Sequence, residues 1–416
     1  MQYVIRQFDV ETAFLNGDLE EDVYMEAPYG IEIAPGMVRK LRRSLYGLKQ
    51  AAAVWHKKIC SVFSAMGFEQ CRADTCLFVR RNNAKNKSPT YIVLYVDDLL
   101  IGCKSDAEAD TIYKELSEHF TVKSLGAARF ILGMEVNYSQ EKGELVLKQS
   151  QFIMKVVSKF KQNEAYAVRN PICAGQDLTP DESHPVVKDI TSYRKLVGSL
   201  LYITNATRPD ISYAMSVLSQ YLDQPRQMHG RAALRVLHYL MGTKSHGIKY
   251  SKSDDKKMML WAYCDANWGN DKKTRRSTSG VLILLGGAAV VYKSKRQSSV
   301  ALSSAEAEYM ALALATQEVM WIRYLLKEMG VTCKTATTVH MDNKSAISIA
   351  TNQGYTPRAK HIDLRMHFVR DHIEQGDIQL KHVPSAMQLA DYLTKPLGAP
   401  QLMRLRDETG IRESAS

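Results

Sequence analysis

Two adjacent aspartates interrupt what would otherwise be a continuous buried pair of strands. The segment YIVLYVDDLLIGC, residues 91–103, places Asp97 and Asp98 between two runs of apolar, strand-forming residues. Two like charges in such a place are costly unless a cation or hydrogen bonds compensate them. A divalent metal ion would remove the conflict, although an Asp-Asp pair can also be the polar turn of a hairpin. The segment therefore predicts a hairpin with carboxylates at its turn and allows a metal site there.

A third aspartate ends another predicted strand. Residues 4–10, VIRQFDV, have the pattern of a short strand, and Asp9 lies at its end. If this strand and the Asp97/Asp98 turn are neighbours in one sheet, three carboxylates meet at one edge. Three carboxylates are enough to hold two Mg²⁺ ions for phosphoryl transfer.

Length and composition narrow the class of protein. The chain has 416 residues, which favours two or three domains. Its seven cysteines form no Cys-x-x-Cys pair, which favours reduced thiols in an intracellular protein over a disulfide framework or zinc site. The longest apolar run begins at Val281 and is far shorter than the roughly 20 residues that cross a bilayer. We expect a soluble protein without a secretory signal.

The basic charge allows a polyanionic partner. The formal net charge is +11, with basic clusters at residues 39–43, 272–276 and 293–296. Lysine and arginine arranged in this way neutralise backbone phosphates, but they also occur on ordinary solvated surfaces. Charge alone does not decide between these alternatives.

The order of predicted elements indicates an α+β fold. In the first half we expect a strand at 4–10, a helix within 44–68 ending at Gly67, two strands around the aspartate pair, a helix at 106–120 opened by Asp106, and a hairpin at 128–149. Residues 170–185 are rich in Pro, Asp and Ser and read as a linker. The segment 193–240 is helical in pattern.

A different α/β unit follows. We expect strands at 258–265, 298–302, 337–342 and 378–383, a hairpin at 280–292 turning on Gly286 and Gly287, a helix from Ser304 to Met329, further helices through 375, and a helix at 385–395. Acidic residues occur at the ends of these separate elements, namely Asp265, Glu308, Asp342 and Asp391. Four converging acids are what a two-metal nuclease needs, although each one alone could be a helix or strand cap. Glu306 fits a capping box with Ser303, which leaves Glu308 as the ligand.

The motifs of the first half resemble a known family. The segments FDVETAFLNGDLEEDVYMEAPYG, LRRSLYGLKQ and YVDDLL resemble the reverse transcriptase of copia-type retrotransposons, and the likeness continues through nearly the whole chain. The resemblance implies that Asp9, Asp97 and Asp98 are catalytic and bind two Mg²⁺ or Mn²⁺ ions.

The same resemblance implies residues that bind substrate. Phe14 matches an aromatic steric gate that favours deoxynucleotides, although core packing would explain it equally well. Gln50 resembles a residue of the nucleotide pocket. Leu132 and Gly133 lie in FILGMEV, which resembles the hairpin that grips the primer.

The motifs of the second half resemble the ribonuclease H domain of the same elements. They are YCDANWG, SSAEAEYMAL, MDNKSAI and HVPSAMQLADYLTKPL. The resemblance implies a mixed five-stranded sheet with helices on both sides, and two metal ions held by Asp265, Glu308, Asp342 and Asp391. We assign His382 no catalytic role. We expect His361, His367 and His372 to be packing or surface residues because their spacing lacks the pattern of a zinc site.

Carried over to the whole chain, the resemblance predicts four regions. These are a palm at 1–150 with the fingers largely missing, thumb and connection helices at 151–255, a ribonuclease H-like domain at 256–397, and a tail at 398–416. The chain begins almost at the first aspartate motif, so we expect an N-terminally truncated Pol polyprotein. It also has Ala53 where the family tends to have arginine before the tryptophan.

The predicted function is RNA-directed DNA polymerase with ribonuclease H activity. Its expected partners are an RNA template, a DNA primer, their hybrid, deoxynucleoside triphosphates and other Pol or Gag products, with no membrane. We expect it in cytoplasmic virus-like particles or in the nucleus. Two alternatives stay open. One is ribonuclease H activity alone, because the fingers are missing, and the other is a domesticated nucleic-acid-binding protein without chemistry.

Overall fold

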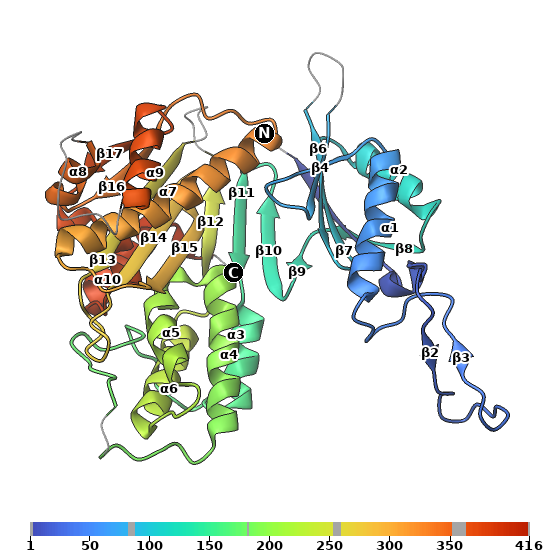
Figure 1. Cartoon of the computed structure of the whole chain (residues 1–416), viewed down its shortest axis with the longest axis horizontal. Coiled ribbons are helices and arrows are strands. Elements are labelled where there is room, and N and C mark those ends of the chain that lie inside the picture. The colour runs from blue at the N-terminus through green and yellow to red at the C-terminus, as the bar shows by residue number, and fades with distance from the viewer. Residues whose placement is uncertain (1–2, 82–87, 181–182, 253–258, 352–362, 415–416) are drawn as a thin grey trace. The chain divides into compact units, whose positions relative to one another are not determined.

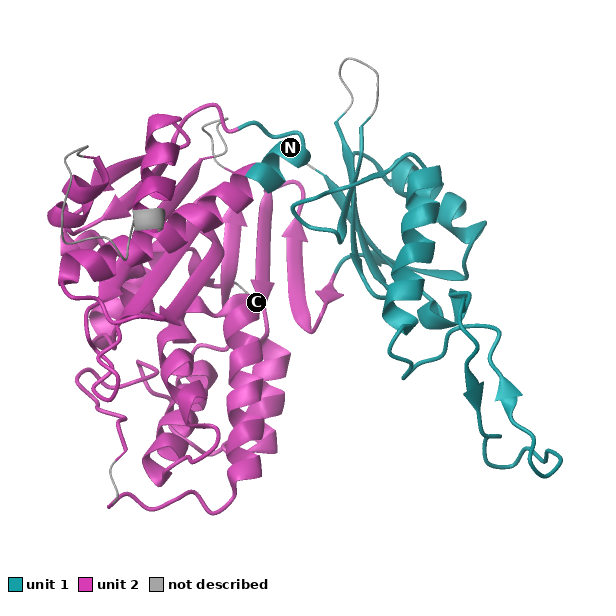
Figure 2. Ribbon diagram, viewed as in Figure 1, with its two compact units in different colours: residues 1–128, 324–332 teal, residues 129–323, 333–416 magenta. Residues whose placement is uncertain are grey.

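The chain is a mixed α/β protein with several sheets, described from a computed structural model (Figure 1). The structure describes residues 3–81, 88–180, 183–252, 259–351 and 363–414. It groups them by packing into two compact units, residues 1–128 with 324–332 and residues 129–323 with 333–416 (Figure 2). This grouping does not test the four functional regions predicted above, whose boundaries stay a prediction.

The first unit is built on a six-stranded sheet in the order β4-β5-β6-β7-β1-β8. Its strands are β1 (Val4–Val10), β4 (Glu69–Gln70), β5 (Leu77–Arg80), β6 (Thr90–Tyr95), β7 (Asp98–Cys103) and β8 (Val122–Ala127). All the pairings in this sheet are antiparallel. A separate short ribbon pairs β2 (Tyr24–Met25) with β3 (Arg39–Lys40).

Two helices supply the core of this unit. They are α1 (Ala51–Ala65) and α2 (Asp106–Ser117), and they bury apolar side chains together with those of the sheet. Trp55 and Phe63 of α1 are among the largest fully buried side chains of the described residues. The end of α7 (Ser304–Glu328) and the residues that follow it also belong to this unit, where Leu325 and Met329 pack against the buried cluster of Cys71, Leu77 and Val79.

Both predicted helices of this unit are present. Helix α1 begins at Ala51 rather than near Ser44, because residues 44–50 form turns. Helix α2 begins at Asp106 as predicted, and its N-cap is Ser105, whose side chain accepts a hydrogen bond from the Glu108 amide. A serine in extended conformation directly before a helix is a favoured N-cap, and the periodicity of the helix could not reveal it.

The second unit contains two five-stranded sheets. One has the order β18-β12-β11-β10-β9 and the other β15-β14-β13-β16-β17. The second sheet is mixed, because β13 pairs antiparallel with β14 but parallel with β16, which in turn is parallel to β17. The strands are β9 (Phe130–Ile131), β10 (Met134–Ser139), β11 (Glu144–Lys148), β12 (His246–Ser251), β13 (Leu260–Asn267), β14 (Thr278–Leu285), β15 (Ala288–Arg296), β16 (Thr337–Met341), β17 (Ile378–His382) and β18 (Ile411–Glu413).

Helices α3 to α6 form one large apolar core with parts of this mixed sheet. They are α3 (Ser150–Lys159), α4 (Ile190–Thr207), α5 (Ser212–Leu218) and α6 (Gln227–Gly242). The remaining helices are α7 (Ser304–Glu328), α8 (Lys344–Thr351), α9 (Asp363–Glu374) and α10 (Ala399–Glu408). Helix α7 ends as predicted before Gly330, whose φ of 80° suits a residue without a Cβ.

Four expectations for this unit were wrong or incomplete. Residues 298–302 form no strand. The predicted helix at 385–395 is two short 3-10 helices, because Gln388 between them is extended and donates to the Cys264 carbonyl. Residues 398–416 include helix α10 and strand β18, which pairs with β12. Strand β12 was not predicted, and α3 was predicted only as part of the helical region 151–255.

Two negative findings concern the part of the chain that the structure describes. No helix there is long and apolar enough to span a membrane. All seven cysteines lie within the described residues, and each is a free thiol.

A fully buried ion pair ties the helices of the second unit together. Arg208 and Asp210 have no exposed side-chain surface, and their N–O distances are 2.9 and 2.7 Å. The Tyr239 hydroxyl donates to Asp210 at 2.6 Å, and the Arg208 guanidinium donates to the Thr243 carbonyl at 2.9 Å. The attraction of Arg208 and these hydrogen bonds keep the pKa of Asp210 lowered, although burial opposes them.

Asp210→Asn should therefore destabilise the second unit strongly. Removing one member of a buried pair leaves the other charge uncompensated, at a cost of about 3–5 kcal/mol. Urea unfolding followed by circular dichroism would measure it. Asp223→Asn is the matched control, because Asp223 pairs with Arg194 but its side chain is 98% exposed. Loss of this surface pair should lower the free energy of unfolding by less than about 1 kcal/mol. Equal midpoints for the two variants would contradict the prediction.

His246 should make the stability of this unit depend on pH. Burial, with Arg406 and Arg208 nearby, lowers the pKa of His246 from 6.5 to about 4. Between these two pKa values the histidine is protonated in the unfolded chain but not in the folded chain. The free energy of unfolding therefore decreases as the pH falls from 6.5 towards 4, by about 3 kcal/mol at most. His246→Phe should flatten the unfolding free energy between pH 7 and pH 4.5, whereas His367→Phe, at an exposed histidine, should leave the slope unchanged.

Candidate active sites

The three aspartates of the first unit lie at one edge of its sheet. Strands β1 and β7 pair so that Asp9 is opposite Asp98, and the Val10 amide donates to the Asp97 carbonyl at 2.9 Å. Burial raises the pKa of Asp9, and the charges of Asp97 and Asp98 raise it further. The structure thus brings the three carboxyl groups near one another, while their role as metal ligands stays a prediction.

The hairpin turn that carries two of these aspartates is strained and held from both sides. Val96 has a φ of 57°, an unusual value for a β-branched residue. The indole N–H of buried Trp55 donates to the Val96 carbonyl at 2.6 Å. On the other side, the Gln7 side-chain amide donates to Asp98 Oδ1 at 3.1 Å. Sequence reasoning missed Trp55 and Gln7, since no local pattern links either residue to the turn.

The predicted substrate residues of the first unit have local partners. Phe14 lies in the 3-10 helix Ala13–Asn16, packs partly buried against the core, and its ring centroid is 4.7 Å from that of Tyr46. Gln50 precedes α1 and donates to Glu21 at 3.3 Å. These contacts are compatible with either interpretation of Phe14, as core residue or as steric gate.

Leu132 and Gly133 form the turn between β9 and β10 in the second unit. Both have positive φ, 49° and 70°. The Tyr202 hydroxyl donates to the Leu132 carbonyl. A Cβ added at Gly133 would lie 2.6 Å from that hydroxyl oxygen, so this position needs glycine.

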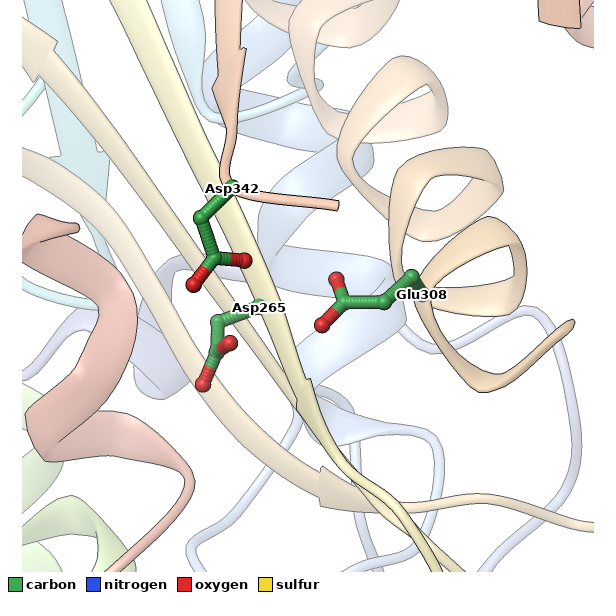
Figure 3. A group of neighbouring side chains, drawn as sticks. All are labelled: Asp265, Glu308 and Asp342. Atoms are coloured by element: carbon green, nitrogen blue, oxygen red, sulfur yellow. The ribbon is translucent and has the colours of Figure 1, made fainter. Parts of the chain in front are cut away.

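The second acidic set converges in space. Asp265 lies in β13, Glu308 lies one turn into α7 and Asp342 directly follows β16. Each offers one carboxylate oxygen, and these three atoms lie within 4.8 Å of one another (Figure 3). The parallel pairing of β13 with β16 brings the first and third acids to the same end of the sheet, and the start of α7 adds the second.

The surroundings of this trio suit a divalent cation. Asp265 is 3% exposed and Glu308 is 5% exposed. Burial, followed by the charges of Asp265 and Asp342, raises the pKa of Glu308 to about 9. Glu308 Oε2 is buried and has no hydrogen-bond partner among the described residues. Mg²⁺ and Mn²⁺ prefer oxygen ligands such as these, and a bound cation would relieve the repulsion and satisfy the unpaired oxygen.

The fourth predicted acid, Asp391, lies beside this trio but outside it. It is 3% exposed and belongs to the 3-10 helix Leu389–Leu393. Its Oδ1 is 2.8 Å from the Lys395 ammonium. Burial and then the charge of Asp265 raise the pKa of Asp391 to about 6. The neighbouring Thr394 hydroxyl donates to Asp265.

Glu306 has a structural role at the start of α7, as its capping position suggested. Its amide donates to Ser303 Oγ at 3.2 Å, and its carboxylate accepts from the Leu302 amide at 2.7 Å.

Three of the histidines considered above lie within the described residues, and the group of possible metal ligands found there contains none of them. His382 and His367 are exposed. His372 contacts Asp377 at 2.9 Å. His361 lies outside the described residues.

Comparison with known proteins identifies the class and then the family. Residues 1–174 match the family model described as reverse transcriptase (RNA-dependent DNA polymerase). The retrovirus-related Pol polyprotein from transposon RE1 of Arabidopsis thaliana is 37% identical over 98% of this chain and 27% of that protein. A putative transposon Ty5-1 protein of Saccharomyces cerevisiae is 36% identical over 75% of this chain and 100% of that protein.

The chain is thus of the reverse transcriptase class. More particularly, it belongs to the Pol proteins of copia-type retrotransposons. It spans 27% of the RE1 polyprotein and 30% of the Pol polyprotein from transposon TNT 1-94 of Nicotiana tabacum, which is 36% identical. Among solved structures, LC11-RNase H1, isolated from compost, is similar to 33% of the chain and 94% of that protein, with 18% identity and a TM-score of 0.27.

Proposed function

We propose that this chain is the reverse transcriptase and ribonuclease H part of a copia-type Pol protein, with a two-metal phosphoryl-transfer site in each half. The observation that carries the proposal is the acidic trio of Asp265, Glu308 and Asp342, whose ligand oxygens lie within 4.8 Å of one another and of which Asp265 and Glu308 are buried. A protein that only binds nucleic acid gains nothing from buried negative charge facing phosphate.

In the ribonuclease H half, the acidic side chains would bind the metal ions. Asp265, Glu308, Asp342 and Asp391 would hold two Mg²⁺ or Mn²⁺ ions, which would supply an activated water and stabilise the leaving oxygen. The proposed substrate is the RNA strand of an RNA/DNA hybrid. Thr394 would keep the Asp265 carboxylate in one orientation through its hydrogen bond. The burial of the acids limits the approach of bulk water to the reacting phosphate.

In the polymerase half, Asp9, Asp97 and Asp98 would hold two further ions beside the primer terminus, within a palm formed by residues 1–150. Phe14 and Gln50 would line the pocket for the deoxynucleoside triphosphate. Leu132 and Gly133 would support the primer, with thumb and connection helices in 151–255. The net charge of +11 is suited to holding the phosphates of template, primer and hybrid.

Assembly with other Pol or Gag products, in virus-like particles or in the nucleus, belongs to the same proposal and rests on the family alone.

A second candidate is ribonuclease H activity alone. It is favoured by one difference between the two acidic sets. Within the described residues, only the second set has three ligand oxygens within 4.8 Å. This candidate predicts hybrid cleavage without primer extension.

One gel assay tests both candidates. The purified chain is incubated with a labelled RNA template annealed to a shorter labelled DNA primer, with Mg²⁺ and deoxynucleotides. Extension together with RNA cleavage supports the full proposal, and cleavage alone supports the second candidate. If the chain binds the hybrid but neither extends nor cleaves it, both candidates fail.

Trp55→Phe should slow primer extension without affecting hybrid cleavage. The change keeps an aromatic ring in the core but removes the hydrogen bond to the Val96 carbonyl. A lost hydrogen bond of about 1 kcal/mol at the strained turn should reduce the extension rate by roughly fivefold. Hydrogen exchange of the amides at residues 96–98 should become faster. Unchanged exchange there would mean that Trp55 does not hold the turn.

A further inference from the structure

A lysine lies among the acids of the second site. Lys395 follows Asp391 by one helical turn, and its Nζ is 2.8 Å from Asp391 Oδ1. The Asp391 side chain is 4% exposed, whereas that of Lys395 is 38% exposed. The lysine therefore reaches from the surface to a buried carboxylate.

This ammonium is the acids' single counter-ion among the described residues. The ion pairs there include none with Asp265, Glu308 or Asp342, and Asp391 is paired only with Lys395. Four acidic side chains thus have one cationic partner. The ligand oxygens of the other three acids lie within 4.8 Å of one another. Asp391 does not belong to that group, and it is the acid that pairs with Lys395.

The backbone around Lys395 is fixed, so the side chain is the movable part. Gly280 of β14 is so close to this segment that a Cβ there would lie 2.6 Å from Thr394 Cγ2 and 3.0 Å from the Ala390 carbonyl oxygen. The Lys395 amide donates to the Asp391 carbonyl at 3.2 Å. A lysine side chain has four flexible carbons and a compact charge, so it can leave Asp391 without moving the main chain.

We propose that Lys395 is the resident counter-ion of this acidic cluster and competes with a divalent cation for Asp391. Without metal, the ammonium binds Asp391 and offsets part of the repulsion among the acids. When a second cation enters, Lys395 leaves, and the freed Asp391 joins the other three acids as a ligand. The inference rests on the metal-binding role proposed above and adds to it a positioning residue that sets the affinity for metal.

Lys395→Met tests the inference through metal binding. The full chain also carries Asp97→Asn and Asp98→Asn, so that the acids of the first unit contribute little, and Mn²⁺ is titrated by calorimetry. Methionine keeps an unbranched apolar stem and removes the charge. The affinity should rise about tenfold, because a neighbouring positive charge no longer opposes the cation. In EDTA the variant should melt at a lower temperature than its parent, and Mn²⁺ should raise its melting temperature more.

Three further variants make the result specific. Lys395→Arg keeps the charge and should bind Mn²⁺ within about threefold of the parent, as should Lys381→Met, which removes an exposed lysine of β17. In an Asp391→Asn background, Lys395→Met should raise the affinity by about twofold at most, because the carboxylate under competition is absent and only the repulsion of the cation by the more distant charge is removed. If Lys395→Met does not fold, Lys395→Gln replaces it.

The outcomes separate this inference from the proposed function. If the parent binds Mn²⁺ and Lys395→Met binds it no more tightly, the competition is refuted while the metal site stands. An effect of Lys395→Met that keeps its full size with Asp391→Asn also refutes it. If the parent neither binds Mn²⁺ nor gains stability from it, the proposed metal site fails, and this inference fails with it.

Discussion

Asp265→Asn should abolish cleavage of the RNA strand in a hybrid, with a loss of about 10³-fold or more. Asp265 is 3% exposed and offers one of the three converging ligand oxygens. Replacing a carboxylate ligand by an amide removes a charge that holds the cations. Metal-ion catalysis lowers the activation barrier by several kcal/mol, and this stabilisation would be lost. Initial rates on a labelled hybrid in Mg²⁺ would measure the loss.

A second readout separates loss of metal binding from loss of folding. Burial and the neighbouring acids raise the pKa of Asp265 and of Glu308, so the folded metal-free protein carries a repulsion that asparagine relieves. Asp265→Asn should therefore melt in EDTA no lower than the wild type, and Mn²⁺ should no longer raise its melting temperature.

The matched control is Asp371→Asn, at an exposed aspartate of α9 in the same unit. It should keep both cleavage and the Mn²⁺ effect. If Asp265→Asn still cleaves the hybrid at close to the wild-type rate, the assignment of the second site is wrong.

Local sequence patterns predicted much of the fold, because apolar and polar residues alternate along a strand that buries one face. The hairpin around Asp97 and Asp98 and the hairpin β14–β15 follow from apolar runs separated by turn residues. Strand β12 was missed, and β18 was taken for a tail. Strand β18 has only three residues, and β12 lies between partners far away in the sequence, β11 on one side and β18 on the other. Such pairing depends on tertiary register, which local periodicity does not encode.

The acids were easier to predict than the residues that hold them. An aspartate at the end of an apolar strand is visible in a sequence, because a charge there conflicts with the pattern around it. Trp55, Gln7 and Lys395, in contrast, are compatible with the sequence pattern around them. An indole in an apolar helix or a lysine near the surface is ordinary, and its hydrogen bond to a particular turn or acid appears only when the chain is folded.

Asp98→Asn should abolish primer extension while hybrid cleavage continues. Asp98 faces Asp9 across the β1–β7 pair, and its Oδ1 accepts the Gln7 amide. Asparagine can keep that hydrogen bond, so the fold of the turn should survive. The lost charge would remove a metal ligand, and we expect the extension rate to fall about 10³-fold or more. Single-nucleotide incorporation on an RNA template would measure it.

Asp110→Asn, at an exposed position of α2, is the control for charge and should extend primers normally. The same preparations report on the second site, so cleavage by Asp98→Asn shows that the chain is folded and bound to the hybrid. Because the two acidic sets lie in different compact units, each substitution should remove one activity and leave the other. If Asp98→Asn removed both activities, the two reactions would depend on one site, and the assignment of separate sites would have to be abandoned.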